Sequence, residues 1–127
     1  MKVLQDIWII EKSGIVVFHR AYDKAVPPQL FGAMMSALNH FAEQLTEGGL
    51  SNFDLQNTRF TLIKQSELIF VAISSKTFKQ KKVNKELKKV SNKFINLYAE
   101  RLESFKGKLG AFAEFEKEIE DSIEKKF

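Results

Sequence analysis

The sequence predicts a single domain of mixed α/β (α+β) class, in which helices cover both faces of a five-stranded, mainly antiparallel sheet. Three observations lead to this prediction. Two β-rich runs open the chain around a turn, and both are apolar at successive positions, which indicates a sheet covered on both faces. Apolar residues then recur at helical spacing in a first helix. Three more β-rich runs and two more helical patterns follow, and no repeat or linker divides residues 1–127.

The first two strands are expected at Val3 to Ile10 and Ile15 to Tyr22, joined by a short turn that contains Gly14. The other three are expected at Ser51 to Gln56, Thr58 to Lys64 and Leu68 to Ile73. Phe53 alternates with polar neighbours, which is typical of an edge strand, whereas the last run is apolar on both faces, as a central strand is.

The first helix is expected to begin after Pro27-Pro28 and to end before Gly48-Gly49. One apolar stripe along it is expected to face the sheet: Leu30, Met34, Leu38, Phe41 and Leu45. Phe31, Met35 and Ala42 widen the apolar surface beyond the arc of about 100° that a sheet covers. Either a second helix or a partner must shield them, and we favour a partner.

The later helices are expected to pack together on the opposite face of the sheet. The stripe of the first of them contains Val83, Leu87, Val90, Phe94, Leu97, Leu102 and Phe105. Gly107 and Gly110 interrupt the pattern. The last helix is expected to bury Phe112, Phe115, Ile119 and Ile123. The predicted order is therefore strand, strand, helix, three strands, helix, helix.

Charge is distributed unevenly along a chain whose net charge is +4. Lysines crowd the first half of the later helical region, and the candidates for contact with an anionic surface are Lys81, Lys82, Lys85, Lys88 and Lys89. The favoured interpretation is a solvated helix face, partly neutralised by the acidic last helix. Attraction to anionic lipid is the second interpretation. Nucleic acid is the third, because no aromatic residue interleaves for base stacking.

Catalysis finds little support in the sequence. The chain has no Cys, and its two histidines, His19 and His40, lack the spacing of a metal site. No Gly-rich phosphate loop accompanies Gly48-Gly49. We therefore expect no catalytic residue, no metal and no cofactor. The N-terminus does not resemble a signal peptide and no apolar run approaches the length of a membrane span, so we expect a cytoplasmic protein, with peripheral membrane contact as an option.

The chain resembles a longin domain over essentially its whole length. The hairpin IWIIEKSGIVVFHRAY, the helix QLFGAMMSALNHFAEQL, the run ELIFVAIS and the paired C-terminal helices fall in the order that this fold uses. The roadblock domain is the alternative, since it is a related fold with its helices redistributed. A roadblock chain usually opens with a helix and ends with one long helix, whereas this chain opens in a strand and ends with two helices.

The resemblance implies a protein-interaction module of small-GTPase and membrane-trafficking machinery, and not an enzyme. No heptad segment or membrane anchor follows the domain, so we expect a free-standing subunit or dimerising platform. Family members pair through the first helix and an adjacent sheet edge. That pairing implies a partner interface at Phe31, Met35, Asn39, Ala42 and Phe53. The implied partners are a second copy, another longin or roadblock protein, and a small GTPase.

Overall fold

A computed structural model describes residues 3–20, 27–103 and 112–123. The chain opens with the hairpin of β1 (Asp6–Glu11) and β2 (Val16–Arg20), followed by α1 (Pro28–Leu45). Three strands come next: β3 (Asn52–Asp54), β4 (Thr58–Gln65) and β5 (Leu68–Ser75). The helix α2 (Gln80–Glu103) and the 3-10 helix η1 (Ala113–Ile119) complete the order, which is the order that the sequence predicts.

The five strands form one antiparallel sheet in the order β2-β1-β5-β4-β3. The apolar run that begins at Leu68 becomes β5 at the centre of the sheet, and the segment around Phe53 becomes the edge strand β3. Both predictions are confirmed. The connection through α1 carries the chain from the first hairpin to the opposite edge, so that β1 pairs with β5, with Trp8 opposite Val71.

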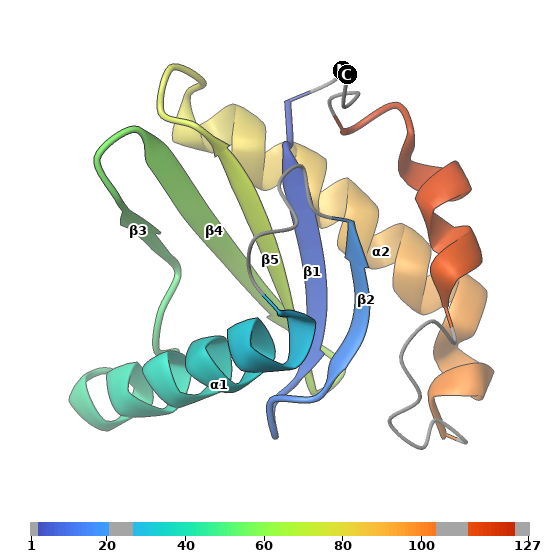
Figure 1. Cartoon of the computed structure of the whole chain (residues 1–127), viewed down its shortest axis with the longest axis horizontal. Coiled ribbons are helices and arrows are strands. Elements are labelled where there is room, and N and C mark those ends of the chain that lie inside the picture. Colours follow the sequence, from blue (N-terminus) through green and yellow to red (C-terminus); the bar gives the residue numbers. More distant parts are fainter. Residues whose placement is uncertain (1–2, 21–26, 104–111, 124–127) are drawn as a thin grey trace.

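The sheet lies between α1 on one face and α2 with η1 on the other (Figure 1). Successive side chains of a strand point to opposite faces. In β1, Trp8 therefore joins the core beneath α1, whereas Ile9 joins the core beneath α2. The same division holds in β5, where Phe70 and Val71 lie in different cores. The predicted layering is confirmed.

An aromatic cluster fills the core beneath α2. The fully buried ring of Phe94 is at its centre, and four rings surround it with centroids 4.9 to 6.0 Å away: Phe70, Tyr98, Phe112 and Phe115. Most of these pairs meet edge to face, a preferred arrangement of aromatic rings. Helix α2 and the chain that leads into η1 are thus held to the sheet by one continuous group of rings.

Two expectations for the later helices need correction. Leu97 is 50% exposed, because the buried side of α2 runs through Val90, Phe94 and Tyr98 at spacings of four. The last helix is a short 3-10 helix and not a longer α-helix. Its expected apolar residues are nevertheless buried. Tyr22, Phe105, Gly107 and Gly110, and the side chain of Leu102, lie outside the described residues.

The C-terminal segment is tied to both the start of the chain and α2. The carbonyl of Ser122 accepts hydrogen bonds from the backbone N–H groups of Val3 and Leu4 at 3.1 and 3.0 Å. Leu4 and Ile123 form a parallel bridge beside them. The Ser122 hydroxyl donates to the buried carboxylate of Glu86 in α2 at 3.0 Å. One serine therefore links the two ends of the described chain to the long helix.

Candidate interaction surface on helix α1

Helix α1 lies against the sheet with Phe31, Gly32, Met35 and Asn39 buried. The ring of Phe31 stacks on that of Trp8, with centroids 4.0 Å apart and an interplanar angle of 21°. The Asn39 side-chain oxygen accepts a hydrogen bond from the Leu50 backbone N–H at 3.3 Å. The expectation that Phe31, Met35 and Asn39 face a partner is therefore wrong, because the chain's own sheet and loop occupy them.

The close approach of α1 to the first hairpin explains this orientation. A Cβ atom at Gly32 would lie 2.3 Å from the Gly14 carbonyl oxygen and 2.7 Å from a methyl group of Val16. Only glycine permits that contact, since real Cβ atoms do not approach other atoms so closely. Gly32 must therefore face the hairpin, and Phe31 and Met35 turn towards the sheet with it. A glycine inside a helical pattern was the signal for this close approach.

The opposite side of α1 is apolar and exposed. Its five large side chains are Leu30, Met34, Leu38, Phe41 and Leu45, with exposed fractions of 54%, 56%, 38%, 62% and 72%. They were expected to pack on the sheet, and that expectation is wrong. The broader prediction, that α1 carries more apolar surface than its own sheet covers, is confirmed. We call these five residues the outer α1 face. Contiguous exposed apolar surface of this kind usually marks a binding site.

The two remaining residues of the predicted interface lie at the border of this region. Ala42 is half-buried at the flank of α1. Phe53 is half-buried on the edge strand β3, on the side of the sheet that α1 covers, where its ring stacks on Phe60 at 4.5 Å. Both residues remain partly accessible, and their contact with a partner stays a prediction.

Ion pairs join β3 to its neighbours at the same edge of the sheet. The Arg59 Nε atom lies 3.0 Å from an oxygen of Asp54, and Lys76 Nζ lies 3.8 Å from the other oxygen. The hydrogen bond from Arg59 is the main cause that lowers the pKa of the Asp54 carboxyl, with smaller contributions from the charges of Arg59 and Lys76. Desolvation opposes the shift without reversing it. The pair therefore favours the ionised form of Asp54 in the folded protein.

We expect Arg59→Leu to raise the pKa of Asp54, measured by NMR titration of the side-chain carboxyl carbon. Because folding lowers this pKa, the stabilisation is present above the unfolded value and is lost as pH falls through the folded value. Lys12→Leu is the control, since Lys12 pairs with Glu67 and not with Asp54. An Asp54 pKa that is the same in the wild type and Arg59→Leu would contradict the assignment.

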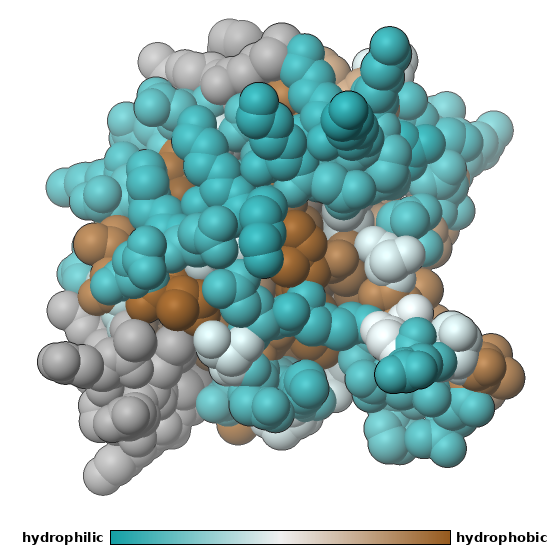
Figure 2. Space-filling model, turned by 180° about the vertical axis from the view of Figure 1, so that it is seen from behind, coloured by the Kyte–Doolittle hydropathy of each residue, from teal (hydrophilic) through white to brown (hydrophobic). Residues whose placement is uncertain are grey.

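The lysines of α2 lie on the face of the molecule that Figure 2 shows, where hydrophilic side chains cover much of the surface. Lys81, Lys85, Lys88 and Lys89 are exposed, and Lys82 is half-buried. Lys89 lies 3.8 Å from the Glu86 carboxylate, so it is partly neutralised within α2 itself. The predicted candidates therefore share one helix, but not one electrostatic environment.

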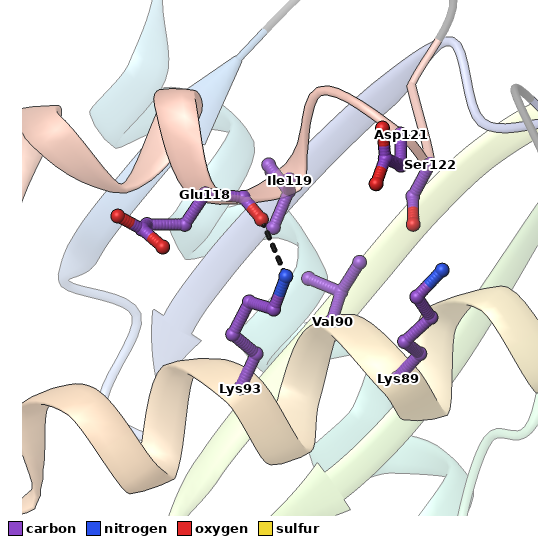
Figure 3. Close-up of a pocket in the computed structure, with 7 residues that line it drawn as sticks. All are labelled: Lys89, Val90, Lys93, Glu118, Ile119, Asp121 and Ser122. Atoms are coloured by element: carbon purple, nitrogen blue, oxygen red, sulfur yellow. Dashed lines mark hydrogen bonds between the residues drawn. The ribbon is translucent and has the colours of Figure 1, made fainter.

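The acidic C-terminal segment runs beside α2 on the Lys89 flank. Lys93 Nζ donates to the backbone carbonyl of Glu118 at 2.8 Å (Figure 3). Lys89 and Asp121 line the same notch between the two elements, which is too shallow to hold a ligand. This contact is made to a backbone oxygen and not to a carboxylate, so the predicted charge attraction between the two helices stays a prediction.

The two histidines lie on different elements and in different environments. His19 is on β2, where its ring stacks on Trp8 at 5.0 Å, and His40 is on the exposed part of α1. Across residues 3–20, 27–103 and 112–123, no three His, Asp or Glu side chains gather in a way that could hold a metal ion. Within the same ranges, no helix has the length and apolar character needed to span a membrane.

Solved structures with a similar fold share little sequence identity with this chain. Among solved structures, the chain is similar to Myxococcus xanthus MglB, with a TM-score of 0.61 and 14% identity over 76% of this chain and 84% of that chain. The gliding protein MglB from Thermus thermophilus gives a TM-score of 0.48 and 15% identity over 64% of this chain and 67% of that one. A Roadblock/LC7 domain from Streptomyces avermitilis gives 0.46 and 14%, over 57% and 67%.

No protein with a curated description is detectably similar in sequence. A family model described as the first longin domain of FUZ, MON1 and HPS1 matches residues 5–113, which include the hairpin, α1, the remaining strands and α2. The chain therefore belongs to the family of first longin domains of FUZ, MON1 and HPS1.

Proposed function

We propose that this longin domain is a protein-interaction module that dimerises through the outer α1 face and acts as a subunit or regulator of small-GTPase and membrane-trafficking machinery. The observation that carries the proposal is the row of five exposed apolar side chains along α1. Membership of a longin family supports the class of machinery. The module acts by binding in the cytoplasm, and neither histidine has a catalytic role.

A second copy of the chain is the simplest occupant of the outer α1 face. Two-fold symmetry places the same patch on both partners. An antiparallel pair of α1 helices would bring Leu38 close to the symmetry axis. Leu30 would then meet Leu45 of the partner subunit, and Met34 would meet Phe41 of the partner subunit. Ala33 and Ala37, which are small and exposed, leave room for the helices to approach. Phe53 on the β3 edge would extend the contact.

We expect Met34→Glu to raise the dimer dissociation constant by about a hundredfold, because burying unpaired carboxylates at the interface would cost about 3 kcal/mol. Sedimentation velocity over a range of concentrations measures this constant. Leu97→Glu is the matched control, since Leu97 is also a half-exposed apolar residue on a helix, but lies on the opposite side of the sheet. A wild-type protein that stays monomeric at high micromolar concentration would refute the dimer, and equal weakening by both variants would refute the outer α1 face as its interface.

Another longin or roadblock chain is the second candidate occupant, because the same apolar row would serve a mixed pair. Affinity capture from native lysate distinguishes the two, with wild type and Met34→Glu as parallel baits. A captured longin or roadblock chain that is lost with Met34→Glu would establish a mixed complex. A small GTPase among the captured proteins would support the proposed machinery, and its absence from every bait would count against it.

A further inference from the structure

Helix α2 carries three exposed lysines along its outward side, Lys81, Lys85 and Lys88, which we call the lysine ridge. Their spacings of four and three residues place them on one line along the helix. That line is opposite the buried positions Val83 and Leu87, and all three lysines are exposed. We propose that the lysine ridge docks the protein on anionic lipid headgroups at a membrane surface.

Within the part of the chain that the structure describes, the charge of the lysine ridge is not cancelled by its surroundings. Among the described residues, no carboxylate forms an ion pair with Lys81 or Lys85, and Lys88 contacts the neutral Gln65 side chain at 3.4 Å. Glu86 is the acidic neighbour on the same helix, but it is buried and engaged by Ser122 and Lys89. The positive potential of the ridge is therefore directed into solvent.

Residues 112–123 of the acidic C-terminal segment do not reach the ridge either. Their contacts with α2 fall on the flank of Lys89 and Lys93, where the Lys93 ammonium donates to the Glu118 carbonyl (Figure 3). The sequence alone grouped Lys89 with the other candidates, whereas the structure separates them. Lys89 lies beside the C-terminal segment and pairs with Glu86, whereas Lys81, Lys85 and Lys88 are available to contact a partner.

The shape and chemistry of the ridge favour a lipid surface over other anionic partners. The outward side of a helix is convex, and the notch between α2 and the C-terminal segment lies on the Lys89 flank and not at the ridge. Lysine is a point charge without the planar fork that arginine offers to a specific carboxylate or phosphate. The described ridge has no aromatic side chain on which a base could stack. Several lysines on a convex surface suit diffuse attraction to a flat layer of headgroups.

The ridge is independent of the proposed dimer. Helix α2 lies on the opposite face of the sheet from α1, so a partner on the outer α1 face leaves the ridge accessible (Figure 1). A variant on one surface therefore tests that surface alone. Phe41→Gln, which alters the outer α1 face without adding charge, is expected to keep the vesicle binding of each protomer.

The test compares the wild type with the triple variant Lys81→Gln/Lys85→Gln/Lys88→Gln on vesicles of phosphatidylcholine with and without phosphatidylserine. Each lysine near an anionic surface contributes about a fivefold factor, so the triple variant is expected to lower the partition coefficient by about a hundredfold. Wild-type binding is expected to require phosphatidylserine and to weaken as salt screens the charges. Circular dichroism checks that the variant, which changes exposed side chains alone, remains folded.

The matched control removes the same charge elsewhere, with Lys12→Gln/Lys76→Gln/Lys117→Gln, whose lysines are exposed and lie outside α2. This control is expected to retain most of the binding. Equal loss in both triple variants would overturn the proposal, since net charge alone would then explain the attraction. Failure of the wild type to bind phosphatidylserine vesicles at low salt would overturn it as well. Retention on duplex DNA or polyglutamate, but not on vesicles, would assign the ridge to a different partner and would also overturn it.

Discussion

Replacing Phe94 by alanine is expected to lower the free energy of unfolding by about 3–5 kcal/mol, the usual range for removing a large aromatic side chain from a core. Phe94 is fully buried and is surrounded by rings from β5, α2 and the C-terminal segment. The smaller alanine would leave a cavity and would lose contacts that join all three parts. Because those parts come from different elements, they could not easily close around the cavity. Urea denaturation followed by circular dichroism measures the change.

Leu97→Ala is the control for this prediction, since Leu97 is three residues away on the same helix and half-exposed. Its expected loss is below about 1 kcal/mol, because little apolar surface is removed from a packed environment. A Phe94→Ala loss no larger than that of Leu97→Ala would show that the aromatic cluster does not stabilise the domain.

Gly32→Ala is expected to destabilise the protein by about 1–3 kcal/mol, the range for forcing extra atoms into a packed contact. The sign of the change in the free energy of unfolding is the informative result. Helix propensity alone predicts that alanine in place of glycine stabilises a helix by about 1 kcal/mol. The added Cβ would lie 2.3 Å from the Gly14 carbonyl oxygen, so α1 would have to move away from the hairpin. Thermal and urea denaturation give the sign.

Ala37→Gly measures the propensity contribution in the same helix, since Ala37 is exposed. It is expected to destabilise by about 1 kcal/mol, the propensity difference between the two residues. If Gly32→Ala stabilised the protein by the amount that Ala37→Gly loses, the contact between α1 and the hairpin would not determine the orientation of the helix.

The strands and layers were predictable because their signals are local. Leu68 to Ile73 is apolar at both odd and even positions, so the sequence places it in the middle of a sheet covered on two faces, and it is the central strand β5. Phe53 alternates with polar neighbours and lies on the edge strand β3. Alternation along a strand reports directly on how many of its faces are buried.

The candidate site was only half predictable. The width of the apolar surface on α1 showed that some of it must remain uncovered, and the outer α1 face confirms this. The apolar pattern could not predict which side of α1 faces the sheet, because the side containing Met34 and the side containing Met35 are both apolar. Asn39, which the resemblance placed at a partner interface, is buried instead, and its side-chain oxygen accepts a hydrogen bond from the Leu50 backbone N–H.

The sequence by itself determined the number and order of the elements, the central and edge strands and the excess of apolar surface on the first helix, since each depends on neighbours within one segment. The tertiary structure alone decided which side of α1 faces outward and which lysines of α2 form no ion pair with another described residue. Those outcomes depend on contacts between distant residues: Gly32 with Gly14, Phe31 with Trp8, and Lys93 with Glu118. No periodicity within a helix encodes what approaches it from another part of the chain.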